Sequence, residues 1–141
     1  MALKIIDYGS KEYQQMIDLR NEILRHPLGL KLEENDISSD QNNILIGAFE
    51  EEKMLGCCML VKQNSTVQLR QMAVRNQLQG KGIGRALMEF AETIARDTGF
   101  REISMHARSS SSGFYERLGY KIDGDEFIKL SIAHILMKKR I

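Results

Sequence analysis

Three glycines occupy alternate positions, Gly80, Gly82 and Gly84, between an apolar run and an amphipathic segment that is typical of a helix. Glycine lets several backbone N–H groups approach a ligand because no Cβ atom stands in the way. The turn also ends at the positive pole of the predicted helix, which favours anions. We therefore expect a bound phosphate or pyrophosphate here, and with it a nucleotide-like cofactor.

The common phosphate-binding motifs do not account for this turn. A Rossmann fingerprint requires G-x-G-x-x-G, but the third position after Gly84 is Leu87. Glu102, near the distance of the ribose-binding acid, begins a strand instead of ending one. A P-loop requires G-x-x-x-x-G-K-[ST], which the chain lacks. On these residues alone, a glycine-rich connection without a ligand is the alternative.

Segments with helix or strand periodicity surround the turn. Residues 83–95 place apolar side chains at i, i+3 and i+4, as a helix does, and residues 103–108 alternate as a strand does. Further helices are expected from Ser10 to Pro27 and from the serines at 109–112 to Gly119, and further strands at residues 3–6, 44–49, 54–62, 67–74 and 132–137. This order predicts an α/β (α+β) domain over residues 1–141, with a mixed sheet and helices on both of its faces.

Composition argues against several classes of function. The net charge of +1 and the lack of a basic face or an aromatic stacking motif disfavour nucleic-acid binding. No apolar run approaches the ~20 residues of a membrane span, and no signal-peptide core is present at the N-terminus. Cys57 and Cys58 are adjacent, which disfavours a disulfide between them, and no residues show metal-ligand spacing. We expect a cytoplasmic protein without a metal or a membrane partner, and a homodimer is compatible with the sequence.

Two motifs resemble the hallmarks of one enzyme family. Gln79-x-x-Gly82-x-Gly84, preceded by the strand at 67–74, is similar to the Q/R-x-x-G-x-G/A acyl-CoA signature of the GCN5-related N-acetyltransferases (GNAT). The segment from Phe114 to Tyr120 resembles the second hallmark, F-Y-x-x-x-G-[FY], in the right order and spacing. The resemblance covers nearly the whole chain. It implies acetyl-CoA as cofactor and a mostly antiparallel mixed sheet that is splayed at the cofactor site.

The resemblance also assigns roles to residues. Backbone groups of Met72, Ala73 and Val74 would bond the pantetheine arm, and one N–H would polarise the thioester carbonyl. Tyr115 would donate a proton to the departing thiolate, although packing beneath the last strand is the alternative for this ring. The pyrophosphate would be held at the helix start by Gln79, Gly80, Lys81, Gly82, Ile83, Gly84 and Arg85.

A narrower resemblance points to the glyphosate N-acetyltransferase group, through the segments 23–25, 68–73, 107–115 and 132–137. It implies that His134 is the general base and that Arg25, Arg70 and Arg108 bind the acidic group of a small amine. Histidine suits proton removal near neutral pH, and the arginine fork matches carboxylate or phosphonate oxygens. Activity on glyphosate itself does not follow.

Two departures and several alternatives accompany this interpretation. Ala133 replaces the usual proline before the histidine, and Glu126 adds a charge that could pair with an arginine. Each arginine could also pair with an internal carboxylate, and His134 could be structural. We expect direct acetyl transfer to a small, acidic amine, with buried, inert thiols at Cys57 and Cys58. The alternatives are a protein or peptide N-acetyltransferase and a non-catalytic acyl-CoA-binding module.

Overall fold

The computed structural model covers residues 1–141 and contains one eight-stranded sheet. Its strand order is β1-β2-β3-β4-β5-β8-β6, and β7 pairs with the same strand, β8, as β6 does. Only the β4–β5 pair is parallel. The strands are β1 (Ala2–Ile6), β2 (Ile44–Glu50), β3 (Lys53–Lys62), β4 (Val67–Val74), β5 (Glu102–Arg108), β6 (Lys121–Ile122), β7 (Phe127–Lys129) and β8 (Ile132–Arg140).

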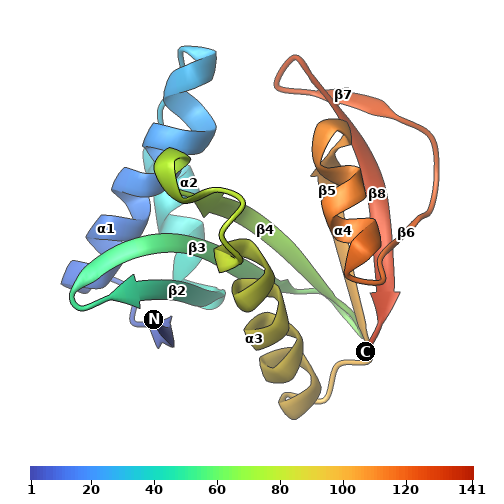
Figure 1. Cartoon of the computed structure of the whole chain (residues 1–141), viewed down its shortest axis with the longest axis horizontal. Helices are drawn as coiled ribbons and strands as arrows, with labels where there is room; N and C mark the ends of the chain where they lie inside the picture. Colours follow the sequence, from blue (N-terminus) through green and yellow to red (C-terminus); the bar gives the residue numbers. More distant parts are fainter.

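Helices cover both faces of the sheet, as the sequence predicts (Figure 1). On one face, Met16 and Leu19 of α1 pack into a core cluster with Phe49 and Met54. On the other face, apolar side chains of α3 pack with those of β2 to β5 and with Tyr115 of α4. The helices are α1 (Lys11–Arg20), α2 (Glu34–Ser38), α3 (Ile83–Asp97) and α4 (Ser112–Arg117). None of them combines the length and the apolar character that a membrane crossing requires.

The parallel pair at the centre of the sheet is short. The β4–β5 ladder has three residue pairs, from Val67↔Ile103 to Leu69↔Met105, and then stops. Figure 1 shows the two strands close together near the C-terminus and diverging toward their other ends. A bulge in β4 accompanies the divergence: the register with β3 shifts between Cys57 and Met59, opposite Gln71, whose φ is +58°. Bulges bend a strand and increase its twist, so this one helps to turn β4 away from β5.

Most predicted elements are confirmed, with three differences. The helix after Ser10, whose Oγ accepts a hydrogen bond from the N–H of Tyr13 at 3.1 Å, is α-helical only to Arg20 and continues as a π-helical turn, Asn21–Arg25. No serine side chain caps α4. Strands β6 and β7 were not predicted, because two- and three-residue strands are too short to show a periodicity.

Candidate active site

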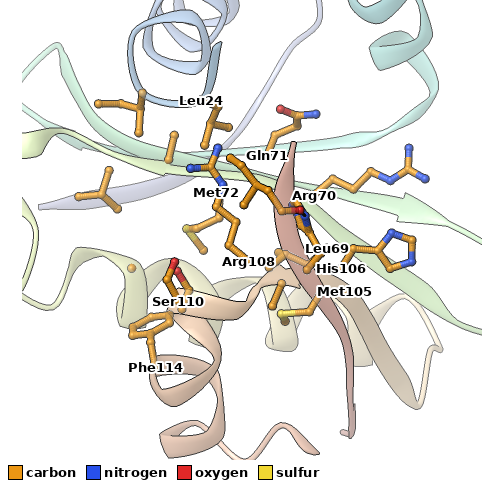
Figure 2. A pocket seen from close by; sticks show the side chains of 18 of the residues that line it. Leu24, Leu69, Arg70, Gln71, Met72, Met105, His106, Arg108, Ser110 and Phe114 are labelled. Atoms are coloured by element: carbon orange, nitrogen blue, oxygen red, sulfur yellow. Dashed lines mark hydrogen bonds between the residues drawn. The ribbon is translucent and has the colours of Figure 1, made fainter. Parts of the chain in front are cut away.

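A cavity of about 930 Å³ opens where β4 and β5 diverge. Seven parts of the chain line it: the π-helical turn after α1, the segment 28–36, β4, the glycine turn with the start of α3, the end of β5, the segment 110–115, and the β7–β8 hairpin. Figure 2 shows Leu24 on one side of this space and Ser110 and Phe114 on the opposite side, with Arg70 and His106 toward one end. The cavity thus brings together segments from both halves of the sequence.

The glycine turn leaves open space beside its backbone. Gly80 and Gly82 have φ values of +82° and +86°, and a Cβ atom built on either would meet nothing within 4 Å. No side chain caps the N-terminus of α3, and its first turn holds no acidic residue. Gly84 has a different reason to be glycine, because its Cβ would lie 3.2 Å from Cζ of Phe114. An uncapped helix start beside open space fits a bound anion such as a pyrophosphate.

The polar side chains of the glycine turn lie in three different environments. Gln79 Nε2 donates to the carbonyl of Val74 at 3.1 Å and so braces the turn against β4. Arg85 forms an exposed ion pair with Glu89 at 3.1 Å, and its side chain still lines the cavity. Lys81 is exposed and is not part of the lining.

The edge of β4 that faces the cavity has no strand partner beyond Leu69. Met72, Ala73 and Val74 line the cavity, while the opposite edge of this stretch pairs with Cys57 and Gly56 of β3. The Ala73 side chain is buried, and those of Met72 and Val74 are partly buried against the core. The side chains therefore pack, as expected, and main-chain groups on the free edge are left for a ligand.

Tyr115 both packs in the core and lines the cavity. Its side chain is buried, with the rings of Phe114 and Tyr120 at centroid distances of 5.0 and 6.0 Å. Burial raises the pKa of the Tyr115 phenol above its ordinary value of 10.0. The phenol therefore keeps its proton at neutral pH, and it is a weaker acid than a tyrosine in water.

His134 lies directly opposite Arg108 in the antiparallel β5–β8 pair and lines the same cavity. Its Nδ1 lies 2.8 Å from the carbonyl oxygen of Ile132. Because a carbonyl can only accept, Nδ1 carries the hydrogen and the neutral ring has its lone pair on Nε2. Phe127 stacks on the ring at 5.9 Å and 24°. These contacts orient the ring.

Three arginines from separate segments meet in this cavity: Arg25 from the π-helical turn, Arg70 from β4 and Arg108 from β5. None of them lies within 4.0 Å of a carboxylate oxygen, so the alternative of internal ion pairs is wrong. Arg70 Nε donates instead to Gln68 Oε1 at 2.6 Å. Glu126 is exposed and forms no ion pair with an arginine, which was one of the possibilities that the sequence left open.

Positive charge dominates this part of the cavity. Burial lowers the pKa of Arg25, and the charges of Arg20 and Arg108 lower it further, whereas the charge of Asp36, which also lines the cavity, raises it. Burial also lowers the pKa of Lys129, with contributions from Arg70 and Arg25. The cationic side chains are therefore close enough to repel one another, which favours an anionic ligand among them.

Sequence reasoning missed several polar residues of the cavity, among them Glu33, Asp36, Gln71, His106 and Lys129. Lys129 lies on β7, which was not predicted. His106 was interpreted as structural, although strand alternation places it on the same face as Arg108, two residues later. The Phe127 ring lies 5.1 Å from that of His106, and burial lowers the pKa of His106.

The two cysteines lie outside the cavity lining, and both are fully buried. Burial raises the pKa of Cys57 to about 12 and also raises that of Cys58. The prediction of buried thiols is confirmed. No group of three or more His, Cys, Asp or Glu side chains is arranged to hold a metal ion.

Comparison with known proteins agrees with this geometry. Residues 12–141 match the model of the acetyltransferase (GNAT) domain. The chain is 26% identical to a Bacillus subtilis protein named as a candidate acetyltransferase, over 81% of this chain and 77% of that one. It spans about half the length of three other curated relatives.

Solved structures show the same fold. An aminoglycoside 6'-N-acetyltransferase in complex with coenzyme A superposes with a TM-score of 0.82, at 17% identity over 99% of this chain and 97% of the other. The PaiA N-acetyltransferase of Thermoplasma acidophilum, also with coenzyme A, gives a TM-score of 0.76 at 18% identity over the whole of both chains. The splayed mixed sheet is therefore the acyl-CoA N-acyltransferase fold.

Proposed function

Because this chain belongs to the GNAT acetyltransferases, we propose that it moves an acetyl group from acetyl-CoA to the amine of a small substrate that carries a carboxylate or phosphonate. The observation that supports this most strongly is that Arg25, Arg70 and Arg108 line one cavity with His134 and have no carboxylate partner. Arg25 and Arg108 are half-buried and Arg70 is exposed, and arginines that lack a carboxylate partner favour an anionic ligand. The resemblance to the glyphosate N-acetyltransferase group assigns the same residues to this role.

The chain offers a continuous binding surface for coenzyme A. The amides from Gln79 to Arg85, at the start of α3, would hold the pyrophosphate. The free edge of β4 at Met72, Ala73 and Val74 would bond the pantetheine arm. The bound group supplies an acetyl thioester, whose carbonyl carbon is the electrophile. One β4 N–H donates to the carbonyl oxygen and stabilises the negative charge that develops there.

His134 and Tyr115 supply the proton transfers. His134 Nε2 removes a proton from the substrate ammonium, which frees the nitrogen lone pair. As the N–C bond forms and the C–S bond breaks, the electron pair of the broken bond would go to sulfur, and the Tyr115 hydroxyl would protonate it. The Tyr115 phenolate would then take the second proton from the nitrogen, which leaves the neutral amide. The amine attacks the thioester directly in this scheme. Cys57 and Cys58 are not available as nucleophiles, because they are buried as neutral thiols outside the cavity.

The substrate class is tested by comparing acidic and uncharged amines. Thiol release from acetyl-CoA is measured with amino acids, aminophosphonates and simple alkylamines. Arg108→Ala should raise KM for the acidic amines by about 10- to 100-fold, because it removes a charge-assisted hydrogen bond, and should leave KM for alkylamines nearly unchanged.

The matched control is Arg101→Ala, an exposed arginine outside the cavity, which should change neither KM. An Arg108→Ala effect of equal size on acidic and uncharged amines would contradict the proposed substrate class. Faster acetylation of peptides than of any small amine would favour a protein or peptide acceptor instead.

A further inference from the structure

Gln71 Oε1 is a buried polar atom without a hydrogen-bond partner in the protein. Arg20 Nε and Ser109 Oγ are also buried without a hydrogen-bond partner, but of these three residues only Gln71 lines the cavity. Its amide lies beside the labelled side chains of Met72 and Arg70 (Figure 2). A buried acceptor without a partner destabilises a protein, so an accepting atom in a ligand site is expected to receive a donor from the ligand.

The backbone at Gln71 gives a second reason to assign a role to its side chain. Its φ of +58° lies in the left-handed region, which is unfavourable for a residue with a Cβ atom and suits glycine. The strain occurs at the bulge where β4 leaves β5, one residue before Met72. Strained residues that persist beside a ligand site are candidates for function.

The other polar side chains of this region indicate which group of the ligand donates a hydrogen bond to Gln71. Arg25, Arg70 and Arg108 can only donate hydrogen bonds, and they match the acidic group of the substrate. Gln71 Oε1 can only accept, and it matches an N–H. A substrate with an anion at one end and an amine at the other satisfies both sets.

We propose that Gln71 Oε1 accepts an N–H of the acceptor nitrogen, and that the site thereby selects primary amines over their N-alkylated analogues. This inference rests on the proposed function. Once His134 has taken one proton, a primary amine keeps two N–H groups. When the N–C bond forms and the C–S bond breaks with its electron pair on sulfur, Tyr115 protonates the sulfur and its phenolate takes one of these two protons. The other N–H remains hydrogen-bonded to Gln71 Oε1 in the amide product. A secondary amine has one N–H, which is lost, and leaves Gln71 Oε1 without a donor.

The test uses matched amines and measures thiol release from acetyl-CoA. The pairs are aspartate with N-methylaspartate, and aminomethylphosphonate with its N-methyl analogue. The wild-type protein should favour the primary amine of a pair by about tenfold or more in kcat/KM, which is the effect of one lost hydrogen bond to a charged or polar partner. Gln71→Met should lower kcat/KM for the primary amine by about tenfold and leave the secondary amine within about twofold, so that the preference disappears.

Two further variants separate recognition from folding. Gln71→Gly removes the amide and relieves the left-handed strain, so it should lose the preference while unfolding at a higher temperature than the wild type. Gln71→Glu keeps an accepting oxygen and should keep the preference. Gln63→Met is the control, because Gln63 is an exposed glutamine outside the cavity.

The outcomes distinguish this inference from the function beneath it. An active Gln71→Met or Gln71→Gly protein with an unchanged preference for primary amines would overturn the role of Gln71 alone. A wild-type protein that binds acetyl-CoA and acetylates no amine in the screen would overturn the proposed function, and this inference with it.

Discussion

The ring of His134 is held by its neighbours on two sides. The Ile132 carbonyl fixes the hydrogen on Nδ1, and Phe127 covers one face of the ring. Both neighbours belong to the β7–β8 hairpin, so the orientation of the ring depends on a turn in which Leu130 and Ser131 adopt positive φ values of 53° and 64°. A local hairpin thus sets the orientation of the His134 ring.

Replacing His134 separates catalysis from cofactor binding. We expect His134→Ala to lower kcat by about a hundredfold or more, because a positioned base contributes that much, and to leave the Kd of acetyl-CoA nearly unchanged. Steady-state kinetics and calorimetry measure the two quantities. His26→Ala, at an exposed histidine outside the cavity, is the control. Equal losses of turnover and of cofactor affinity would show that His134 is structural.

The residues that the sequence proposes for catalysis and anion binding all line the cavity, whereas several of their neighbours there were not predicted. Arg70 and Arg108 were recognisable because charged residues are rare in apolar strands. Gln71 was not recognisable, because a bulge depends on the backbone angle of a single residue, which the types of the neighbouring side chains do not reveal. Lys129 was missed for a similar reason, since the three-residue strand that positions it is defined by pairing with β8 and by no pattern of its own.

At the scale of elements, α3 connects the two sides of the cleft. Its apolar face packs on the sheet, its open N-terminus lies at the cavity, and Glu92 near its middle binds Lys139 of β8 at 3.0 Å and the Tyr120 hydroxyl at 2.9 Å. The amphipathic pattern of residues 83–95 predicted this helix correctly. The bonds of Glu92 could not be predicted, because they join segments that are far apart in the sequence.

The start of α3 gives a matched pair of glycine substitutions. Gly82→Asp should weaken acetyl-CoA binding by more than about tenfold, because it places a negative charge where the pyrophosphate is expected. Gly99, just after α3, also has a positive φ, +102°, and open space around its Cβ position, but it lies outside the cavity. Both substitutions place a side chain at a positive φ, so each should lower the free energy of unfolding by ~1 kcal/mol. Gly99→Asp should do so without changing the Kd of acetyl-CoA. Equal Kd values for the two variants would argue against the assigned pyrophosphate site.

At the scale of the whole molecule, the adjacent cysteines link stability to pH. An unfolded thiol loses its proton above about pH 8.5, whereas the pKa of buried Cys57 is raised to about 12 and that of Cys58 is also raised. Between these values the unfolded chain binds fewer protons than the folded one, so stability is full below pH 8.5 and falls as the pH rises.

Denaturant unfolding at several pH values tests this coupling. We expect the free energy of unfolding to fall by about 2 kcal/mol for each thiol between pH 8 and pH 10. A protein with both Cys57→Ala and Cys58→Ala is less stable at pH 8 because it loses buried volume, but its stability should depend less on pH over this range. Equal slopes for the two proteins would refute the coupling.

The unpaired edge of β4 has a consequence for self-association. Free main-chain groups along a strand can template pairing with another chain, and proteins commonly shield such edges. Here the stretch after Leu69 is recessed in a cleft, and the proposed coenzyme would lie along it. Occupancy would then do more than supply a reactive group: it would complete the sheet, and the loaded enzyme would resist aggregation better than the empty one.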